Sequence, residues 1–471
     1  MSRIFDNAHL YASHTENGAV NHSSSGSELV DLFKLAGSSR NHPEELPEAF
    51  ANAAKVDLDV AVRILLHMRD AREGMGERNA FRVVLKSVID NKLLTDDEVM
   101  RIVVKIPELG RYDDLFILLG TRFETEMFRI IEKHLVDEST RGLVGKWLPR
   151  VKKKNKAFTK AFCKFFKLSE KEYRGLLRVT SDTVEQKISS GNFEAIDYSK
   201  VPSLAAARLQ RVFLEKDGER YADYVNSLAS GKAKINAGAV YPYDVLKSSY
   251  HGVSAVAEEQ WKALPNYVTG NENILCMSDV SGSMTCEVFG SVNALDIGLS
   301  LSLYIAERNK GIFKDCVLIY STDPYLKKLE GNLSSRVDQL MQHVEYGSTD
   351  IQAAFKRILD IAKKENIAQD EMPEKVIIFS DMEFNYVEGN RGQTNYEAIA
   401  EQFKDAGYEM PKIIFWYLAS RSKSCEVSAK DDNVAIVSGF SPATLKAVLG
   451  GEKFDPVTVM MKAVMIPRYD W

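Results

Sequence analysis

The chain has 471 residues, of which 45% are apolar and 27% charged, and a net charge of −5; this ordinary globular composition excludes a disordered or fibrous protein. Its five scattered cysteines lack CxxC spacing, which excludes a disulfide framework and predicts reduced thiols in a cytoplasmic protein. No apolar segment of signal-peptide type follows the first residues, and the longest apolar run, 413–419, is far shorter than the roughly 20 residues of a membrane helix, so we expect no membrane partner.

The first half of the chain has the apolar periodicity of helices. Residues 1–28 form a polar lead, and we expect its serine-rich part, 13–28, to be a loop. From residue 29 onward apolar side chains recur at spacings of three and four, and short polar turns separate these segments. We predict an irregular α-solenoid over 29–264. Because no fixed repeat length emerges, an ordinary helical bundle is the alternative.

Within this half, residues 141–178 form a strongly basic segment. It contains thirteen Lys or Arg residues and only two acids, Glu170 and Glu172. Five lysines have helical spacing and predict one outward stripe, opposite phenylalanines that anchor the helix: Lys156, Lys160, Lys164, Lys167 and Lys171.

A row of outward cations suits the phosphate backbone of a nucleic acid, because lysines add sequence-independent, salt-sensitive affinity through counterion release. A solvated lysine face without a partner is the alternative. We predict nucleic-acid contacts for Arg150, Lys152, Lys153, Lys154, Lys156, Lys160, Lys164 and Lys167.

Beyond a connector at 265–270, strand patterns alternate with helix patterns. We expect strands at 273–279, 315–321, 375–381, 412–419 and 434–438, an edge strand at 325–329, and helices at 291–308, 333–344, 350–364, 394–406 and 441–449. This alternation predicts a doubly wound, Rossmann-like parallel sheet over 271–471. Residues 266–471 carry a net charge of −8 and residues 1–265 a net charge of +3, which indicates different partners for the two parts.

The first of these strands ends in the pattern Asp279-x-Ser281-x-Ser283. In an open parallel sheet, ligands bind at the carboxyl edge, where the order of the strands reverses. Mg²⁺ prefers about six oxygen ligands in octahedral geometry and often keeps several waters. Ser281 and Ser283 would coordinate such an ion through their hydroxyls, while Asp279 supplies charge and holds metal-bound water. A strand-to-helix cap without metal is the alternative.

Two later segments supply more oxygens at the same predicted edge. Thr349 precedes an amphipathic helix, and Asp381 ends another apolar strand. This order of motifs resembles the metal-ion-dependent adhesion site (MIDAS) of von Willebrand factor A domains. The resemblance implies a Mg²⁺ site, or one for Mn²⁺ or Ca²⁺, formed by Asp279, Ser281, Ser283, Thr349 and Asp381. Many such domains have Gly after the last acid, where this chain has Met382 and Glu383.

Two stretches of the helical half extend the resemblance. Residues 68–78, MRDAREGMGER, are similar to the "RD-R-G-GER" signature of TROVE proteins, and residues 109–115, LGRYDDL, to their "GRWDDL" element. With the metal motifs following in order, the chain resembles the Ro autoantigen family, and is similar to a less-characterised bacterial or phage-type relative of Ro. The resemblance implies HEAT-like repeats held by a von Willebrand A domain, and a scaffold for small or single-stranded RNA.

These observations favour a non-catalytic RNA-binding scaffold whose metal site engages an acidic protein group or a phosphate. The alternative is a metal-dependent protein-interaction or assembly module without nucleic acid. An enzyme is disfavoured, because the sequence has no Ser-His-Asp order, no P-loop, no HExxH helix and no carboxylate cluster typical of a two-metal nuclease. The resemblance makes Arg69, Arg72, Arg78 and Arg111 either RNA contacts or partners of nearby acids in salt bridges.

Overall fold

The first half of the chain is a succession of packed helices. The computed structural model describes residues 13–181, 183–251, 254–289, 291–344, 347–387, 393–419, 424–449 and 453–471. Neighbouring helices pack on one another along the chain, for example α2 on α3 and α4, α7 on α8, and α13 on α14. The bounds are α2 (Glu28–Ser38), α3 (Leu46–Val56), α4 (Leu58–Arg69), α5 (Arg78–Asp90), α6 (Asp96–Leu109), α7 (Glu124–Val136), α8 (Glu138–Trp147), α9 (Lys156–Phe166), α10 (Glu170–Thr180), α11 (Val184–Ser189), α12 (Ser203–Arg208), α13 (Gln210–Lys216), α14 (Gly218–Ala229), α15 (Pro242–His251) and α16 (Ser254–Lys262).

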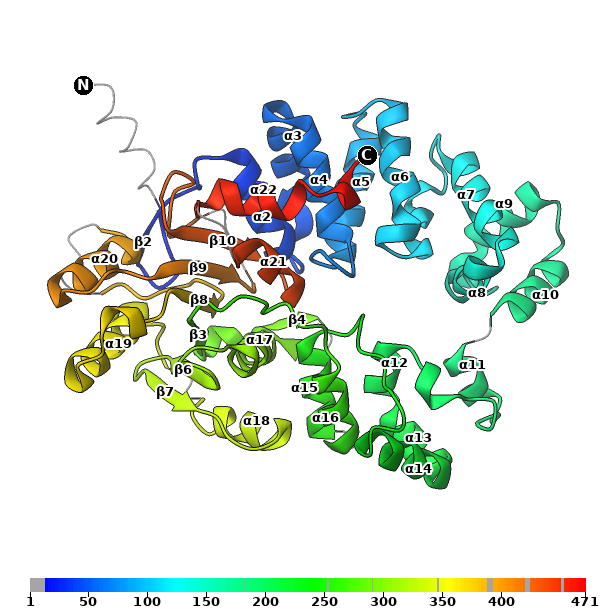
Figure 1. Cartoon of the computed structure of the whole chain (residues 1–471). Coiled ribbons are helices and arrows are strands. Elements are labelled where there is room, and N and C mark those ends of the chain that lie inside the picture. The colour runs from blue at the N-terminus through cyan, green and yellow to red at the C-terminus, as the bar shows by residue number, and fades with distance from the viewer. Residues whose placement is uncertain are drawn as a thin grey trace.

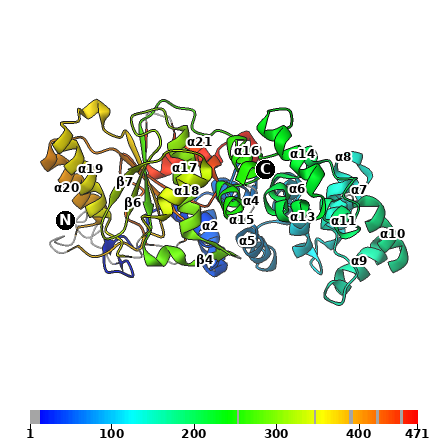
Figure 2. The same cartoon turned by 90° about the horizontal axis from the view of Figure 1, so that it is seen from below.

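These helices follow an arc whose two ends both reach the half of the chain that contains the sheet (Figure 1). At one end α2 packs against β9 and β10, and at the other α15 packs against α17. Helices α9 and α10 lie at the far end of the molecule from the sheet, as the view from below also shows (Figure 2). The solenoid predicted for this half is therefore confirmed, and the sheet spans its two ends.

The second half contains a six-stranded sheet in the order β7-β6-β3-β8-β9-β10. All neighbouring pairs are parallel except β6 and β7, which are antiparallel. The strands are β3 (Ile274–Asp279), β6 (Cys316–Tyr320), β7 (Tyr325–Lys328), β8 (Lys375–Ser380), β9 (Lys412–Tyr417) and β10 (Val434–Ser438). All six predicted strands are present, with ends shifted by no more than two residues, and the doubly wound fold is confirmed.

Helices cover both faces of this sheet. Every residue of β3, β8 and β10 is buried, as expected for parallel strands whose sequences are continuous apolar runs. The covering helices include α17, which packs on β3, β6 and β8, and α19, which packs on β6 and α20. The bounds are α17 (Ala294–Arg308), α18 (Leu333–Met341), α19 (Ile351–Glu365), α20 (Asn395–Ala406), α21 (Leu445–Val448) and α22 (Pro456–Val464). Within the described ranges no helix combines the length and the apolar character needed to cross a bilayer.

The N-terminal segment from residue 13 to residue 25, here called the strap, contacts the segments that follow β8 and β9, and the expectation of a plain loop over 13–28 was wrong for this part. It contains two short antiparallel strands, β1 (Ser13–His14) and β2 (Val20–Asn21), and residues 1–12 lie outside the described residues. Backbone hydrogen bonds join His22 to Cys425, and Ala429 N–H donates to the Ser25 carbonyl. These two partners of the strap lie far from it in sequence, so no local sequence pattern indicated the contacts.

The C-terminal residues return to the beginning of the helical arc. The sequence prediction omitted α22, although Asp455 caps it and Pro456 begins it. After α22 a 3-10 turn, η8 (Pro467–Tyr469), seats Arg468 and Tyr469 on α4. The Arg468 guanidinium and the Tyr469 hydroxyl both donate to the Asp70 carboxylate, at 2.5 Å and 3.1 Å. Both ends of the described chain are thus fastened to elements distant in sequence.

Candidate metal centre and nucleic-acid interface

The DxSxS loop lies at the point where the order of the strands reverses. Strand β3 is central, with β6 on one side and β8 on the other, so the chain leaves β3 and later returns across it. Asp279 is the last residue of β3 and Asp381 follows the end of β8. This is the crevice in which open α/β sheets bind ligands.

The Asp279 carboxylate is fully buried and held from two sides. One oxygen accepts a hydrogen bond from the Ser281 backbone N–H at 2.9 Å, and the other accepts from the Ser380 hydroxyl at 2.5 Å. The Ser281 and Ser283 hydroxyls lie 3.1 Å apart, and Ser283 is exposed at the mouth of the loop. The sequence prediction missed Ser380, although it directly precedes the acid at the end of its strand.

Burial dominates the electrostatics of this edge. Desolvation and the nearby Asp381 carboxylate together raise the pKa of Asp279 to about 7, although hydrogen bonds from Ser380 and Ser281 oppose the rise. Two carboxyl groups held close together favour sharing a proton or binding a cation. The arrangement is thus destabilised when both groups are charged and no cation is bound.

A hydrogen-bonded pair of loops brings Thr349 to the same edge. The Thr349 N–H donates to the Asn385 side chain at 3.2 Å, and the Asn385 N–H donates to the Thr349 carbonyl at 3.0 Å. Thr349 is 1% exposed and Asp381 is 7% exposed. The structure therefore gathers all five predicted metal-site residues at one edge, with Asn385 as a partner that no sequence pattern indicated.

The donor set fits a hard cation. It offers three hydroxyls and two carboxylates, and Mg²⁺ prefers oxygen ligands with few protein carboxylates and some water. The Tyr320 hydroxyl, on the strand next to Asp279, is a further buried oxygen beside this edge. Metal binding itself stays a prediction.

The strap contacts the loop that follows Asp381. The Thr15 hydroxyl donates to the Phe384 carbonyl at 2.6 Å, and the Asn17 side chain donates to the Glu383 carbonyl at 2.6 Å. The Glu383 carboxylate accepts from the Glu16 N–H at 2.6 Å. Glu383, which replaces part of the usual motif, is therefore engaged by the strap.

A buried carboxyl group under the strap gives a pH-dependent prediction. Glu426 accepts from the Tyr417 hydroxyl and, at 3.4 Å, from the Asn21 side chain. Burial raises its pKa from 4.5 to about 7, although Lys34 opposes the rise. Because the folded state holds this proton more tightly than the unfolded state, the carboxylate costs stability as pH rises from about 4.5 to about 7.

Glu426→Gln is therefore expected to stabilise the protein relative to the parent at pH 8 but not at pH 5, by up to about 3 kcal/mol. Urea unfolding across this pH range measures the difference, with Glu132→Gln on the exposed face of α7 as the matched control. A difference between Glu426→Gln and the parent that stays constant with pH would contradict the assignment.

The predicted nucleic-acid residues lie on α9, on the 3-10 turn before it, η3 (Lys153–Asn155), and at the flanking positions 150, 152 and 167. The seven predicted lysines are exposed and form no ion pair within the described residues: Lys152, Lys153, Lys154, Lys156, Lys160, Lys164 and Lys167. Arg150 is half-buried, and its guanidinium donates to the Ser181 hydroxyl at 3.2 Å. The surface thus carries a cluster of uncompensated positive charges.

The prediction of one continuous lysine helix was wrong at its end. Helix α9 stops at Phe166, Lys167 has a left-handed backbone with φ of 53°, and α10 begins at Glu170 after the Ser169 cap. Lys171 therefore belongs to a different helix from Lys156. The phenylalanine face was predicted correctly, because Phe158 and Phe162 are buried, meet Phe128 edge to face and contact one another.

The arginines of the two helical motifs divide into two groups. Arg69 is buried and pairs with Asp114, and Arg111 pairs with Asp113. The side chains of Arg72 and Arg78 are exposed and make no hydrogen bond or ion pair within the described residues. Salt bridging accounts for the first two arginines and leaves the other two available to a ligand.

Removing the Asp114 carboxylate is expected to destabilise the fold strongly. Asp114 is completely buried and accepts from Arg69 at 2.6 Å and from Arg82 at 2.7 Å. Asp114→Ala would leave the Arg69 cation, 2% exposed, without its partner, which costs about 3–5 kcal/mol. Urea unfolding measures the loss, and Asp90→Ala, which breaks the exposed Lys86 pair, should cost under about 1 kcal/mol. Equal losses in the two variants would contradict this assignment.

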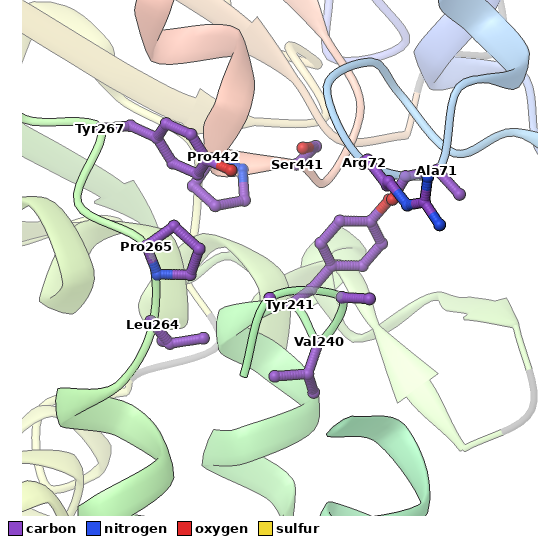
Figure 3. Close-up of a pocket in the computed structure, with 11 residues that line it drawn as sticks. Ala71, Arg72, Val240, Tyr241, Leu264, Pro265, Tyr267, Ser441 and Pro442 are labelled. Carbon is purple, nitrogen blue, oxygen red and sulfur yellow. The ribbon is translucent and has the colours of Figure 1, made fainter. Parts of the chain in front are cut away.

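A small pocket marks the place where both ends of the helical arc meet the sheet (Figure 3). Its lining comes from the loop after α4, the segment before α15, the connector and the loop after β10, and includes Arg72, Tyr241 and Tyr267. The space open to a water-sized sphere is about 20 Å³, which is room for one or two water molecules. The pocket is therefore a junction between packed segments and is too small for a nucleotide.

Comparison with known proteins finds similarity along most of the chain. Residues 273–465 match a family model described as a domain of unknown function, DUF7788, and residues 126–271 match another, DUF2828. The uncharacterized protein L728 of Acanthamoeba polyphaga mimivirus is 26% identical over 509 residues, covering 95% of this chain and 86% of that protein. The crystal structure of the Ro (RSR) protein of Deinococcus radiodurans is 15% identical, with a TM-score of 0.41, over 94% of this chain and 100% of that one. At these identities, the functional argument depends on the geometry described above.

Proposed function

We propose that this protein is a non-catalytic, Ro-like scaffold that binds small or structured RNA through the exposed cations of η3 and α9. One observation carries the proposal: seven clustered lysines are exposed without an ion-pair partner within the described residues, in a protein whose net charge is negative. Surface lysines usually have acids nearby in sequence or space, and this cluster has few. A polyanion would supply the missing negative charge.

The geometry of the surface favours a phosphate backbone as the ligand. The lysines extend from η3 along α9 to its C-terminal cap, while Phe158 and Phe162 anchor the helix beneath them. Such a surface contacts phosphates without reading base edges. Binding would therefore be strongly salt-dependent and weakly sequence-dependent.

The metal centre has a second role in this proposal. Ser281, Ser283 and Thr349 would coordinate Mg²⁺, or Mn²⁺ or Ca²⁺, while Asp279 and Asp381 supply charge and hold metal-bound water. A bound cation with an open position accepts one further oxygen, from a protein carboxylate or from a phosphate. Ser283 is exposed at the mouth of the loop, which would let such a ligand approach.

The function is tested with the full chain, purified with a nuclease and high-salt wash. A labelled RNA stem-loop is titrated between about 50 and 200 mM salt, and the logarithm of affinity should fall linearly with the logarithm of salt concentration, by about 0.9 for each phosphate contact. A protein that binds the stem-loop weakly at every salt concentration would overturn the proposal.

The alternative is a metal-dependent protein-interaction module without nucleic acid. It is supported by the acidic character of the sheet half, net −8 over residues 266–471, which suits a metal site better than direct contact with RNA. In this case Asp279→Ala would abolish a protein complex while the lysine surface had no measurable ligand. Catalysis has less support, since the sequence has no Ser-His-Asp order, no P-loop and no HExxH helix.

A further inference from the structure

Hydrogen bonds fasten the strap to the loop after β8, residues 383–386. The Thr15 hydroxyl donates to the Phe384 carbonyl, and the Asn17 side chain donates to the Glu383 carbonyl, both at 2.6 Å. The backbones of the two segments also form an antiparallel bridge. Because most of these bonds end on main-chain atoms of the loop after β8, the strap fixes the path of that loop.

The same loop holds two residues of the metal centre. Asn385 and Thr349 exchange two hydrogen bonds, one from each backbone N–H, at 3.0 Å and 3.2 Å. The Glu383 N–H donates to the Asp381 carboxylate at 3.3 Å. Thr349 and Asp381 belong to different segments of the chain, so the loop after β8 determines how one lies relative to the other.

The turn between Asp381 and this loop has a strained backbone. Met382 has a φ of 66°, in the left-handed region that residues with a Cβ avoid. Its side chain is buried, and its N–H donates to the Ser380 hydroxyl at 2.8 Å. A residue keeps such a conformation only while its surroundings hold it there. The strap contributes to those surroundings, so the turn is expected to relax when the strap is detached.

We propose that docking of the strap and binding of a divalent cation are coupled, with Thr15, Asn17 and Asn385 as positioning residues for Thr349 and Asp381. The docked strap preorganises these donors and so raises the affinity for the ion. Coupling between two equilibria is reciprocal, and the bound ion therefore holds the strap in place by the same factor. This coupling rests on the metal centre of the proposed function and makes the N-terminal segment a regulator of that centre.

Removing both strap donors tests the coupling in one direction. Thr15→Val/Asn17→Ala in the full chain should raise the Kd for Mn²⁺ about tenfold, because only molecules with a docked strap bind the ion tightly. The electron paramagnetic resonance of free Mn²⁺ measures this Kd. Thr15→Ser keeps the hydroxyl and should bind like the parent. The matched control is Thr140→Val/Asn155→Ala, which removes two side-chain hydrogen bonds to carbonyls of the helical half and should leave the Kd unchanged.

Hydrogen exchange tests the coupling in the other direction. Saturating Mg²⁺ should slow amide exchange in residues 13–25 of the parent about tenfold, because the ion holds the strap docked. Asp279→Asn, which lacks the buried charge of the metal centre, should show no such change. If the strap variant fails to fold, this measurement on the parent carries the test alone.

The outcomes separate the coupling from the metal centre itself. Parent-like Mn²⁺ affinity in the strap variant, or exchange in residues 13–25 that Mg²⁺ does not alter, overturns the coupling and leaves the metal centre intact. A strap that only stabilises the fold gives this result, since its loss lowers the free energy of unfolding without changing the Kd. If the parent binds no Mn²⁺, the metal centre fails together with the coupling, whereas RNA binding by the lysines is decided by its own titration.

Discussion

Replacing Lys153, Lys156, Lys160 and Lys164 together with Ala is expected to lower RNA affinity by about 10²- to 10³-fold near physiological salt. Each lysine is exposed without an ion-pair partner in the described chain, so each is free to displace counterions from a phosphate. The salt dependence should fall with the affinity, by about 0.9 in slope for each lost contact. Titration of the RNA stem-loop at several salt concentrations measures both quantities.

A second set of four lysines provides the matched control. Lys314, Lys328, Lys363 and Lys404 are exposed on the sheet half and likewise form no ion pair within the described residues. Their replacement changes the net charge by the same amount, so a general charge effect would lower affinity equally in both variants. That result, or an unchanged affinity in the α9 variant, would remove the lysine surface from the proposal.

Asp279→Asn is expected to abolish the stabilisation that Mg²⁺ gives the parent protein. A ligand that binds only the folded state adds about 2.7 kcal/mol at a concentration 100 times its Kd. The variant loses the charge that attracts the ion, but the unliganded variant should be at least as stable as the unliganded parent at pH 8. The reason is that burial and Asp381 make a charged Asp279 unfavourable when no cation is present. Thermal unfolding with and without Mg²⁺ measures both effects.

The same carboxyl group makes the effect of the metal depend on pH. Because the pKa of Asp279 is raised to about 7, a proton competes with the cation below that pH, and Mg²⁺ stabilisation of the parent should grow between pH 6 and pH 8. Asp323→Asn, at an exposed position in the loop after β6, should keep the full response. A variant at Asp279 that responds to Mg²⁺ like the parent would exclude the DxSxS loop as the metal site.

The sheet and its edge could be predicted because their signals are local. Strands β3 and β8 are uninterrupted apolar runs, and a parallel strand buried on both faces needs such a run. A strand that ends at Asp279, or directly before Asp381, places that acid at the carboxyl edge. The order of the strands then decides which of these acids are neighbours. The alternation of strands and helices restricts that order to few choices.

The break between α9 and α10 was missed although the sequence contains its signal. Ser169 and Glu172 form a capping box at the start of α10, the pattern of a Ser followed by Glu three residues later. The regular lysine spacing across 156–171 masked this boundary. The lysine spacing correctly indicated a basic surface. Two helices share this surface, whereas the prediction placed it on one continuous helix.

Other features depend on partners outside the local sequence pattern, 36 residues apart for Thr349 and Asn385 and 367 residues apart for Glu16 and Glu383. The contact of the Asn385 side chain with Thr349, and those of the strap with Glu383 and Cys425, join segments that no periodicity connects. The Arg111–Trp147 stack likewise joins two helix ends with no shared motif. Such contacts follow from tertiary packing, which local propensity does not encode.

Helix α2 packs against β10, with Gly37 so close to Ser438 that a Cβ at Gly37 would lie 2.5 Å from the serine hydroxyl. During translation, α2 is synthesised about four hundred residues before its partner strand β10. Until then the apolar face of α2 has no sheet to cover, and closing this contact requires a large loop entropy to be overcome. We expect the last step of folding to be slow and to join both ends of the chain at once. A fragment that starts at residue 271 would lack the helix that covers β9 and β10, and would aggregate.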